Sequence, residues 1–337
     1  MSDPHSINTT DSILNWALLH AMQQSRTGLV RHQVGQIIAK TISDVLGPAG
    51  AAPDDPEVEA ASGVLTNEGY CRVGEVFSAA DIAAIVGHFE ARPCFNSNVV
   101  ASSDKIGRRI RAGAEDFHYG SYTLADVLAA PRLLEFANHP KILGIAHRYL
   151  GCLPTLYSLH AWWTFPGHGK AKHSQEFHRD RDDFKFCTMF IYLTDVGPQG
   201  SPHAYIRRSH RVELVDEILR QSTQRLRAAG LEISLLDLYR GNEEGYGRDE
   251  LYTTLFDGLI DTITGPAGTA FIADTSGLHK GFPAMQERRL MFWARYGLYR
   301  NSAVRADGTE AVTASTIAGR LPRDWRSSYV NRTLIKP

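Results

Sequence analysis

A histidine and an aspartate stand two residues apart in the segment EFHRDRDD, residues 176–183. On an extended strand, residues i and i+2 point to the same face, so His178 and Asp180 would present an imidazole and a carboxylate side by side. First-row metals such as iron accept both ligand types. The pair is therefore a candidate metal site, although a charged surface strand remains the rival interpretation. The acids beyond it, Asp182 and Asp183, are expected in a solvated loop.

A third ligand has to come from elsewhere in the chain, and His279 is the candidate. It follows the strand-like run GTAFIAD and precedes the turn residues Gly281 and Pro283. Two histidines and one carboxylate would occupy one face of an octahedron and leave three positions open. Open positions are typical of a metal that takes part in chemistry rather than one that only supports the fold.

An arginine could anchor a second ligand of such a metal. Arg289 lies ten residues after His279 in QERRLMFWARYG, at the start of a predicted strand. A guanidinium binds a carboxylate through two parallel hydrogen bonds, as a metal-chelating dicarboxylate would need at its far end. Arg288 is the rival, because a one-residue shift swaps the faces of a strand. Arg289 is preferred because Met291 and Trp293 would then line the same cavity.

The elements that must position these residues are short strands. From about residue 155, β-branched and aromatic runs alternate with Gly and Pro turns, a pattern typical of a sandwich or jelly roll. Apolar residues at helical spacing mark 34–46 and 212–229. The sequence thus predicts a mainly β fold with flanking helices in a single domain, 1–337. Its parts are an N-terminal helical extension (1–60), helical and strand support (61–154), a jelly-roll core (155–300) with a helical insertion (211–262), and a C-terminal tail (301–337).

Composition narrows the function classes. The chain has 337 residues and a formal net charge of −1, without the basic excess of a general nucleic-acid binder. Its four cysteines form no CxxC pair, which disfavours a zinc ribbon and a disulfide framework. No signal peptide and no apolar run of the ~20 residues that span a bilayer is visible. We therefore expect a cytoplasmic protein with a small-molecule partner and no nucleic-acid or membrane partner. The insertion is a candidate lid or dimer contact, which makes a homodimer one form to test.

Several segments, taken in order over about 62–300, resemble the phytanoyl-CoA dioxygenase (PhyH) family of iron(II)- and 2-oxoglutarate-dependent oxygenases. They are GVLTNEGYCRVGEVFSAADIAAI, NHPKILGIAHRYLG, HRD, IYLTDVGPQGSPHAYIRRSH and GTAFIADTSGLHKG. The resemblance implies a double-stranded β-helix of the jelly-roll or cupin-like type. It implies Fe(II) held by the catalytic residues His178, Asp180 and His279, and 2-oxoglutarate with its far carboxylate on Arg289. It also implies dioxygen as a cosubstrate, with ascorbate in support.

The activity implied by this resemblance is that of a dioxygenase that hydroxylates an unactivated C–H bond of a small molecule, such as a secondary metabolite. Succinate and carbon dioxide would be released. Desaturation, epoxidation and cyclisation are alternative outcomes. The rivals are a metal enzyme without cosubstrate, such as a ring-cleaving dioxygenase or a zinc hydrolase, and a non-catalytic small-molecule-binding β-barrel.

Two departures from the family pattern bear on the site. Arg207 and Arg208 replace the Pro-Gly of the family's Pro-Gly-Ser-His turn, and they are candidates for contact with an anionic substrate. A tryptophan pair, Trp162 and Trp163, stands where some relatives carry a polar residue. The candidates for further cosubstrate contacts are Thr188, Tyr157 and His160. The candidates for the substrate pocket are Trp163, Phe190, His160 and Trp293.

Overall fold

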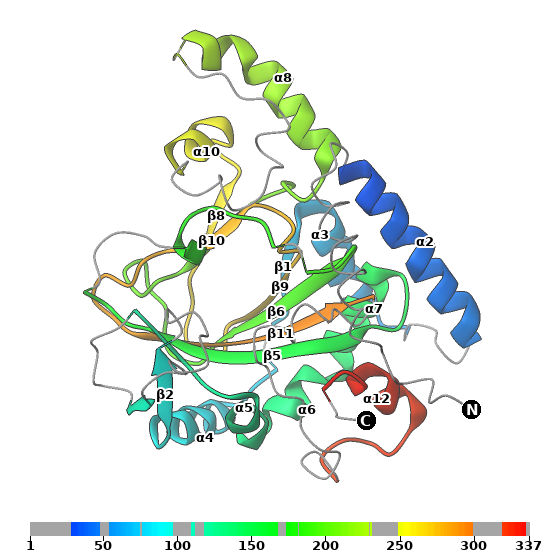
Figure 1. Ribbon diagram of the computed structural model, residues 1–337, viewed down its shortest axis with the longest axis vertical. Coiled ribbons are helices and arrows are strands. Elements are labelled where there is room, and N and C mark those ends of the chain that lie inside the picture. Colours follow the sequence, from blue (N-terminus) through cyan, green and yellow to red (C-terminus); the bar gives the residue numbers. More distant parts are fainter. Residues whose placement is uncertain are drawn as a thin grey trace, which may run out of the picture.

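Two antiparallel sheets face each other across the middle of the molecule (Figure 1). The computed structural model describes residues 28–47, 54–74, 76–96, 109–111, 118–167, 173–180, 182–228, 230, 249–298 and 319–334. The large sheet has the order β1 (Tyr70–Arg72), β9 (Ala270–Ala273), β6 (Phe186–Tyr192), β11 (Arg289–Gly297), β5 (Thr155–Thr164), β4 (Tyr119–Ser121), β2 (Pro93–Asn96), β3 (Arg109–Arg111). The small sheet has the order β10 (His279–Gly281), β7 (His203–Ile206), β8 (Ile260–Ile263). The predicted fold class, a jelly-roll core with flanking helices, is confirmed.

The long central strands β5, β6 and β11 carry the period-two pattern that the sequence predicts. In β11, Leu290, Phe292 and Ala294 are buried in the core between the large sheet and its helices. The alternate residues point to the other face, toward the small sheet. Trp293 pairs with His160 of β5 and with Phe190 of β6, so side chains from three strands meet on that face.

Helices cover the outer face of the large sheet (Figure 1). They are α3 (Pro56–Glu68), α4 (Ala79–Glu90), α5 (Leu124–Ala129), α6 (Leu133–Ala137), α7 (Pro140–Leu150) and α12 (Trp325–Asn331). Their ends follow local rules: Asp55 caps α3, a capping box from Ser78 to Asp81 starts α4, and Gly151 ends α7 in the left-handed conformation. A further helix, α2 (Gly28–Leu46), includes the segment 34–46 that the apolar spacing marks as helical, and ends with it.

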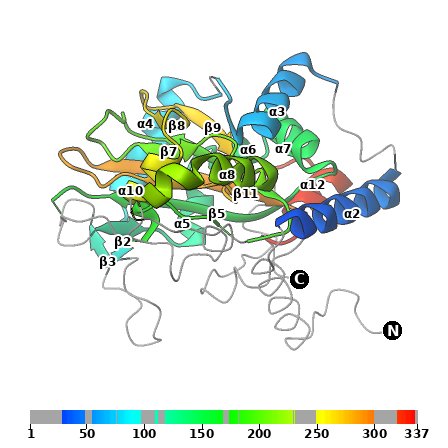
Figure 2. The same ribbon diagram turned by 90° about the horizontal axis from the view of Figure 1, so that it is seen from above.

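The insertion packs on the outer face of the small sheet. Its helices are α8 (Val212–Ala228) and α10 (Asp249–Leu255), which lie in front of the strands in the view from above in Figure 2. Figure 1 shows that α10 lies next to β8 and β10, while α8 extends beyond the small sheet. They share a second apolar cluster with the sheet, made of Phe177, Ala204, Ile206, Val215, Leu219, Leu226, Leu251, Tyr252, Leu255, Phe256 and Leu278. Strand β8 begins at Ile260, inside the range that the sequence assigned to the insertion, and 231–248 lie outside the described residues. No helix of the described ranges is long and apolar enough to cross a membrane.

Candidate active site

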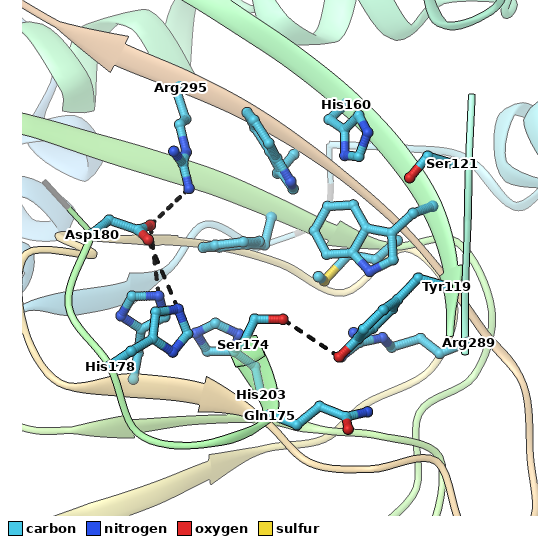
Figure 3. A pocket seen from close by; sticks show the side chains of 16 residues that line it. Tyr119, Ser121, His160, Ser174, Gln175, His178, Asp180, His203, Arg289 and Arg295 are labelled. Atoms are coloured by element: carbon cyan, nitrogen blue, oxygen red, sulfur yellow. Dashed lines mark hydrogen bonds and ion pairs between the residues drawn. The ribbon is translucent and has the colours of Figure 1, made fainter. Parts of the chain in front are cut away.

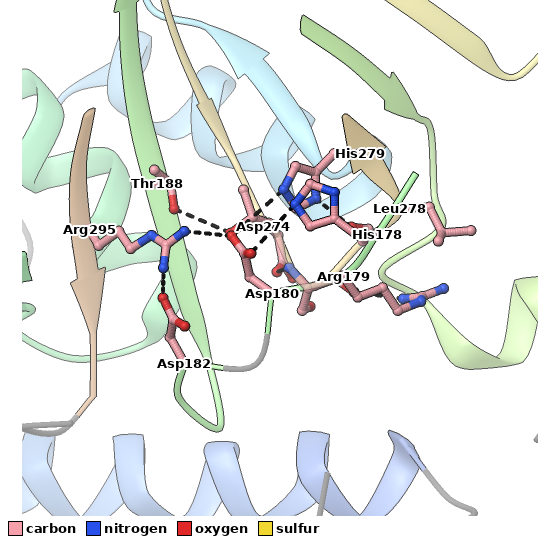
Figure 4. A network of polar contacts seen from close by, with 12 residues as sticks. His178, Arg179, Asp180, Asp182, Thr188, Asp274, Leu278, His279 and Arg295 are labelled. Atoms are coloured by element: carbon pink, nitrogen blue, oxygen red, sulfur yellow. Dashed lines mark hydrogen bonds and ion pairs between the residues drawn. The ribbon is translucent and has the colours of Figure 1, made fainter. Parts of the chain in front are cut away.

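His178 and His279 lie on paired backbone segments at one end of the cavity between the sheets. Each donates its backbone N–H to the other's carbonyl at 3.0 Å, in an isolated antiparallel bridge. The Nδ1 atoms contact the carbonyls of Glu176 at 2.8 Å and Gly277 at 2.9 Å, and these contacts fix the orientation of both rings. The two Nε2 atoms then approach the Asp180 carboxylate, at 3.8 Å from His178 and 3.7 Å from His279 (Figure 4).

Asp180 is held by a cation and by the loop that leads to His279. Its Oδ2 accepts a hydrogen bond from Arg295 at 2.7 Å, and its N–H donates to the carbonyl of Thr275 at 2.8 Å. Burial alone would raise the pKa of Asp180, but the charge of Arg295 and the two histidines lower it below its usual range. Burial, with His279 beside it, lowers the pKa of His178 to about 4. At neutral pH the site therefore presents a neutral His178 imidazole and an ionised carboxylate, which are the forms that bind a metal.

The three side chains fit a metal ion. One ligand atom from each of His178, Asp180 and His279 can be chosen so that all lie within 4.8 Å of one another. Side-chain exposure is only 9%, 16% and 5%, respectively, so a bound ion would be largely shielded from water. Two nitrogens and one oxygen on one side of the ion suit iron(II) and leave its other positions for further ligands. The geometry thus brings together the three residues that the sequence predicted as ligands.

A cavity of about 450 Å³ opens beside the triad (Figure 3). Strands β5, β6 and β11 supply its apolar wall, while β4 and the short helix η2 (His173–Gln175) supply polar groups. The lining residues are Tyr119, Ser121, His160, Trp162, Ser174, Gln175, His178, Asp180, Phe190, His203, His279, Gly281, Arg289, Met291, Trp293 and Arg295.

Arg289 lies in this cavity and Arg288 does not. Arg289 is 3% exposed, and its guanidinium donates to the Ser201 carbonyl and, at 3.1 Å, to the Thr164 hydroxyl. Its Nε has no hydrogen-bond partner in the part of the chain that the structure describes. Arg288 points outward, donating to Glu90 at 2.7 Å. A buried guanidinium that retains an unused donor fits a carboxylate ligand.

The aromatic wall contains three of the four predicted pocket residues and excludes the fourth. Phe190, His160 and Trp293 line the cavity, but the prediction for Trp163 is wrong. Trp163 is fully buried in the core on the opposite face of β5, where its Nε1 donates to the Tyr122 hydroxyl at 2.9 Å. Its neighbour in sequence lines the cavity instead. Trp162 meets Trp293 edge to face, with ring centroids 6.1 Å apart.

Tyr157 and Thr188 lie behind the triad rather than on the cavity wall. The hydroxyl of Tyr157 donates to Asp182 at 3.4 Å. The hydroxyl of Thr188 lies 3.3 Å from that of Thr275, which in turn hydrogen-bonds to Asp180. This placement does not support the predicted contacts to the cosubstrate. The Thr188 hydroxyl instead contacts the partner of Asp180, and the Tyr157 hydroxyl contacts Asp182.

The prediction of a solvated loop for the acids that follow Asp180 is also wrong. The side chain of Asp182 is only 20% exposed and forms an ion pair with Arg295. Asp183 is 3% exposed and accepts the backbone N–H of Leu298 at 2.8 Å. Arg295 itself was missed by the sequence reasoning, although the alternation that selects Arg289 also places it on the cavity face. His203, whose ring stacks on that of His279 at 5.5 Å, was missed as a lining residue as well.

Arg207 and Arg208 are not among the residues that line the cavity. Arg208 donates to Glu68 at 2.9 Å and Arg207 lies 3.3 Å from Asp261, so acids of the fold neutralise both guanidinium groups. Arg208 has φ 65°, a left-handed conformation that favours the glycine found in the family's turn. This placement does not support the predicted contact of Arg207 and Arg208 with an anionic substrate.

The buried imidazole of His160 predicts that the fold is sensitive to acid. Burial, with Arg295 nearby, lowers its pKa from 6.5 to about 4. The unfolded chain then binds the proton more readily, so this contribution to stability is complete above about pH 6.5 and is lost as pH falls toward 4. At about pH 5 the loss is on the order of 1–2 kcal/mol.

His160→Phe should remove this sensitivity, because phenylalanine keeps a ring beside Trp162 and Trp293 but cannot be protonated. The free energy of unfolding is measured with urea on the metal-free proteins at about pH 7 and about pH 5. Its decrease between the two pH values should be smaller in His160→Phe than in wild type by about 1–2 kcal/mol. Trp162→Phe is the matched control and should shift stability equally at both pH values. An unchanged pH dependence in His160→Phe would show that His160 is not its source.

Comparisons with known proteins give matches only among solved structures. No protein-family model matches the chain, and no curated protein matches it. The non-heme alpha-ketoglutarate (2-oxoglutarate) dependent epimerase SnoN from nogalamycin biosynthesis is similar over 72% of this chain and 84% of its own, at 17% identity and TM-score 0.48. HygX from Streptomyces hygroscopicus, with nickel and 2-oxoglutarate bound, is similar over 71% of this chain and 86% of its own, at 13% identity and TM-score 0.43. EctD from S. alaskensis with bound Fe is similar over 75% of this chain and 82% of its own, at 17% identity and TM-score 0.44. At these identities and TM-scores, the similarities establish no activity for this chain.

Proposed function

We propose that this chain is an iron(II)- and 2-oxoglutarate-dependent oxygenase of the PhyH type that hydroxylates a small molecule. The observation that carries the proposal is that one cavity holds both the His178–Asp180–His279 triad and the buried Arg289. When bound, iron(II), 2-oxoglutarate and dioxygen would supply the oxidation, in which 2-oxoglutarate becomes succinate and carbon dioxide and a C–H bond is hydroxylated. The whole chain would form one domain that serves this reaction.

The chain's own residues would bind the metal and 2-oxoglutarate, orient them and exclude water from the site. His178, Asp180 and His279 would hold the metal, with both imidazoles oriented by the backbone carbonyls that their Nδ1 atoms contact. Arg289 would bind the far carboxylate of 2-oxoglutarate. Arg295 would keep the Asp180 carboxylate ionised and fixed in position.

The substrate class follows from the other side of the cavity. Trp162, Trp293, Phe190 and Met291 form an apolar wall that suits an apolar or ring-bearing molecule. Both arginines of the lining already have assignments, Arg289 to the cosubstrate and Arg295 to Asp180 and Asp182. The described lining therefore favours an uncharged group against the wall. Desaturation, epoxidation and cyclisation would use the same residues and differ only in the substrate.

Turnover of 2-oxoglutarate tests the proposal. Purified protein incubated with iron(II), ascorbate and labelled 2-oxoglutarate should release labelled succinate slowly without substrate and faster when a substrate is added. Product mass then separates hydroxylation, which adds one oxygen, from desaturation, which removes two hydrogens. A protein that binds iron(II) but yields no succinate with any of a broad panel of small molecules would instead be a non-catalytic binder or a metal enzyme without cosubstrate.

A further inference from the structure

One carboxylate of the insertion contacts both backbone segments that carry the histidine pair. Asp249 is the first residue of α10. Its Oδ1 accepts the backbone N–H of Phe177 at 3.0 Å, and its Oδ2 forms an ion pair with the ammonium of Lys280. Phe177 immediately precedes His178 and Lys280 immediately follows His279. The side chain of Asp249 therefore joins two segments that lie about a hundred residues apart in the chain.

The two residues that Asp249 contacts, Phe177 and Lys280, occupy corresponding positions beside the β-bridge between His178 and His279. His178 and His279 pair in antiparallel fashion, so Phe177 and Lys280 are the next cross-strand neighbours. Alternation turns their side chains away from the triad and toward the insertion. There Phe177 packs in the apolar cluster of α8 and α10, and the Lys280 ammonium lies 4.6 Å from the centre of its ring and 4.5 Å from that of Phe282.

The charge of Lys280 makes the position of this residue depend on its contact with Asp249. Lys280 is 8% exposed, and in the described part of the chain its ammonium contacts one carboxylate, that of Asp249. A buried ammonium needs such a partner, so the position of β10 depends on the position of Asp249. Elsewhere α10 is anchored by apolar contacts of Leu251, Tyr252 and Leu255. The Asp249 carboxylate is thus a polar link from α10 to the segments that carry His178 and His279.

We infer that Asp249 is a positioning residue, which holds the His178 and His279 segments in register so that their imidazoles converge with Asp180. The inference rests on the proposed metal centre. On this inference, the insertion does more than pack on the small sheet, because Asp249 also positions the metal ligands.

Asp249→Ala and Asp249→Asn test the inference, with Glu250→Ala as matched control, because Glu250 is the exposed next residue of the same helix. Cobalt(II), whose visible spectrum reports coordination geometry, is titrated into each metal-free protein. We expect cobalt affinity to fall about 10- to 100-fold in Asp249→Ala, as for other residues that orient metal ligands, with a changed spectrum. Asp249→Asn keeps an acceptor for the Phe177 N–H and should lose less. Glu250→Ala should match wild type.

Hydrogen exchange of the metal-free proteins gives a second readout. The amides of Phe177, His178 and His279 should exchange faster in Asp249→Ala than in Glu250→Ala. If Asp249→Ala does not fold, Asp249→Asn decides.

The inference is overturned if a folded Asp249 variant keeps wild-type cobalt affinity, spectrum and exchange, or if it loses thermal stability while these three stay unchanged. Failure of the wild-type protein to bind cobalt would count against the proposed centre instead, and the exchange data would still decide the role of Asp249.

Discussion

Asp180→Ala should abolish metal binding and lower 2-oxoglutarate turnover on the order of a thousandfold or more. The variant keeps both imidazoles but removes the one carboxylate of the triad, so an ion would lose its only anionic protein ligand within the described site. The folded state should survive, because Arg295 retains Asp182 as an ion-pair partner. Metal content after loading with iron(II) under anaerobic conditions, and succinate release, measure the two effects.

Asp182→Ala is the matched control for Asp180→Ala. It removes a carboxylate that pairs with the same arginine but stands outside the triad. We expect it to bind one metal ion per chain and to keep most of its turnover. Full metal content in Asp180→Ala, or loss of metal in both variants alike, would contradict the assignment of Asp180 as a ligand.

The pairing of His178 with Asp180 could be predicted from sequence because strand geometry constrains it locally, whereas the approach of His279, about a hundred residues away, depends on tertiary packing. Two residues of a strand separated by one must share a face, so His178 and Asp180 form a pair before any tertiary contact is known. The choice of Arg289 over Arg288 follows from the same alternation. Its continuation through Met291 and Trp293 to Arg295 is visible in the structure.

The position of Trp163 could not be predicted in this way. Adjacent tryptophans are chemically alike, and alternation says only that they face opposite sides. The side is set by register, because Trp162 pairs with Met291 of β11, which itself faces the cavity. Tyr157 lies at an irregularity in the same pairing, near the shift between Arg295 and Tyr296, where the simple alternation no longer applies.

Polar partners that lie far apart in the chain were the other source of error. The departure from the family's turn makes Arg208 a candidate for an anionic substrate, whereas in the structure Glu68 reaches it from the end of α3. Asp182 looked solvated because its partner, Arg295, belongs to β11. The same limit hid Asp249. Contacts of this kind are fixed by tertiary packing, and no local pattern encodes them.

Arg289→Ala should weaken 2-oxoglutarate binding about 100-fold or more while metal binding stays intact. Truncating one partner of a buried, hydrogen-bonded charge pair costs about 2–5 kcal/mol, and Arg289 offers a buried guanidinium with an unused donor to this cavity. The KM for 2-oxoglutarate should rise accordingly. Arg289→Lys should recover part of the loss, because an ammonium keeps the charge but not the two parallel hydrogen bonds.

Arg288→Ala separates this effect from a general loss of positive charge in β11 and its flank. Arg288 pairs with Glu90 on the outer face and packs on Trp163, so its removal should leave the KM for 2-oxoglutarate unchanged. Binding is measured by titrating 2-oxoglutarate into the iron(II)-loaded proteins without oxygen, so that a slow chemical step cannot mimic weak binding. A ring-cleaving dioxygenase, a zinc hydrolase or a non-catalytic binder would not bind 2-oxoglutarate and would not need an arginine for its far carboxylate. If Arg289→Ala folds, binds iron(II) and behaves as Arg288→Ala does, the cavity serves one of those rivals, because the buried guanidinium would then have no carboxylate to bind.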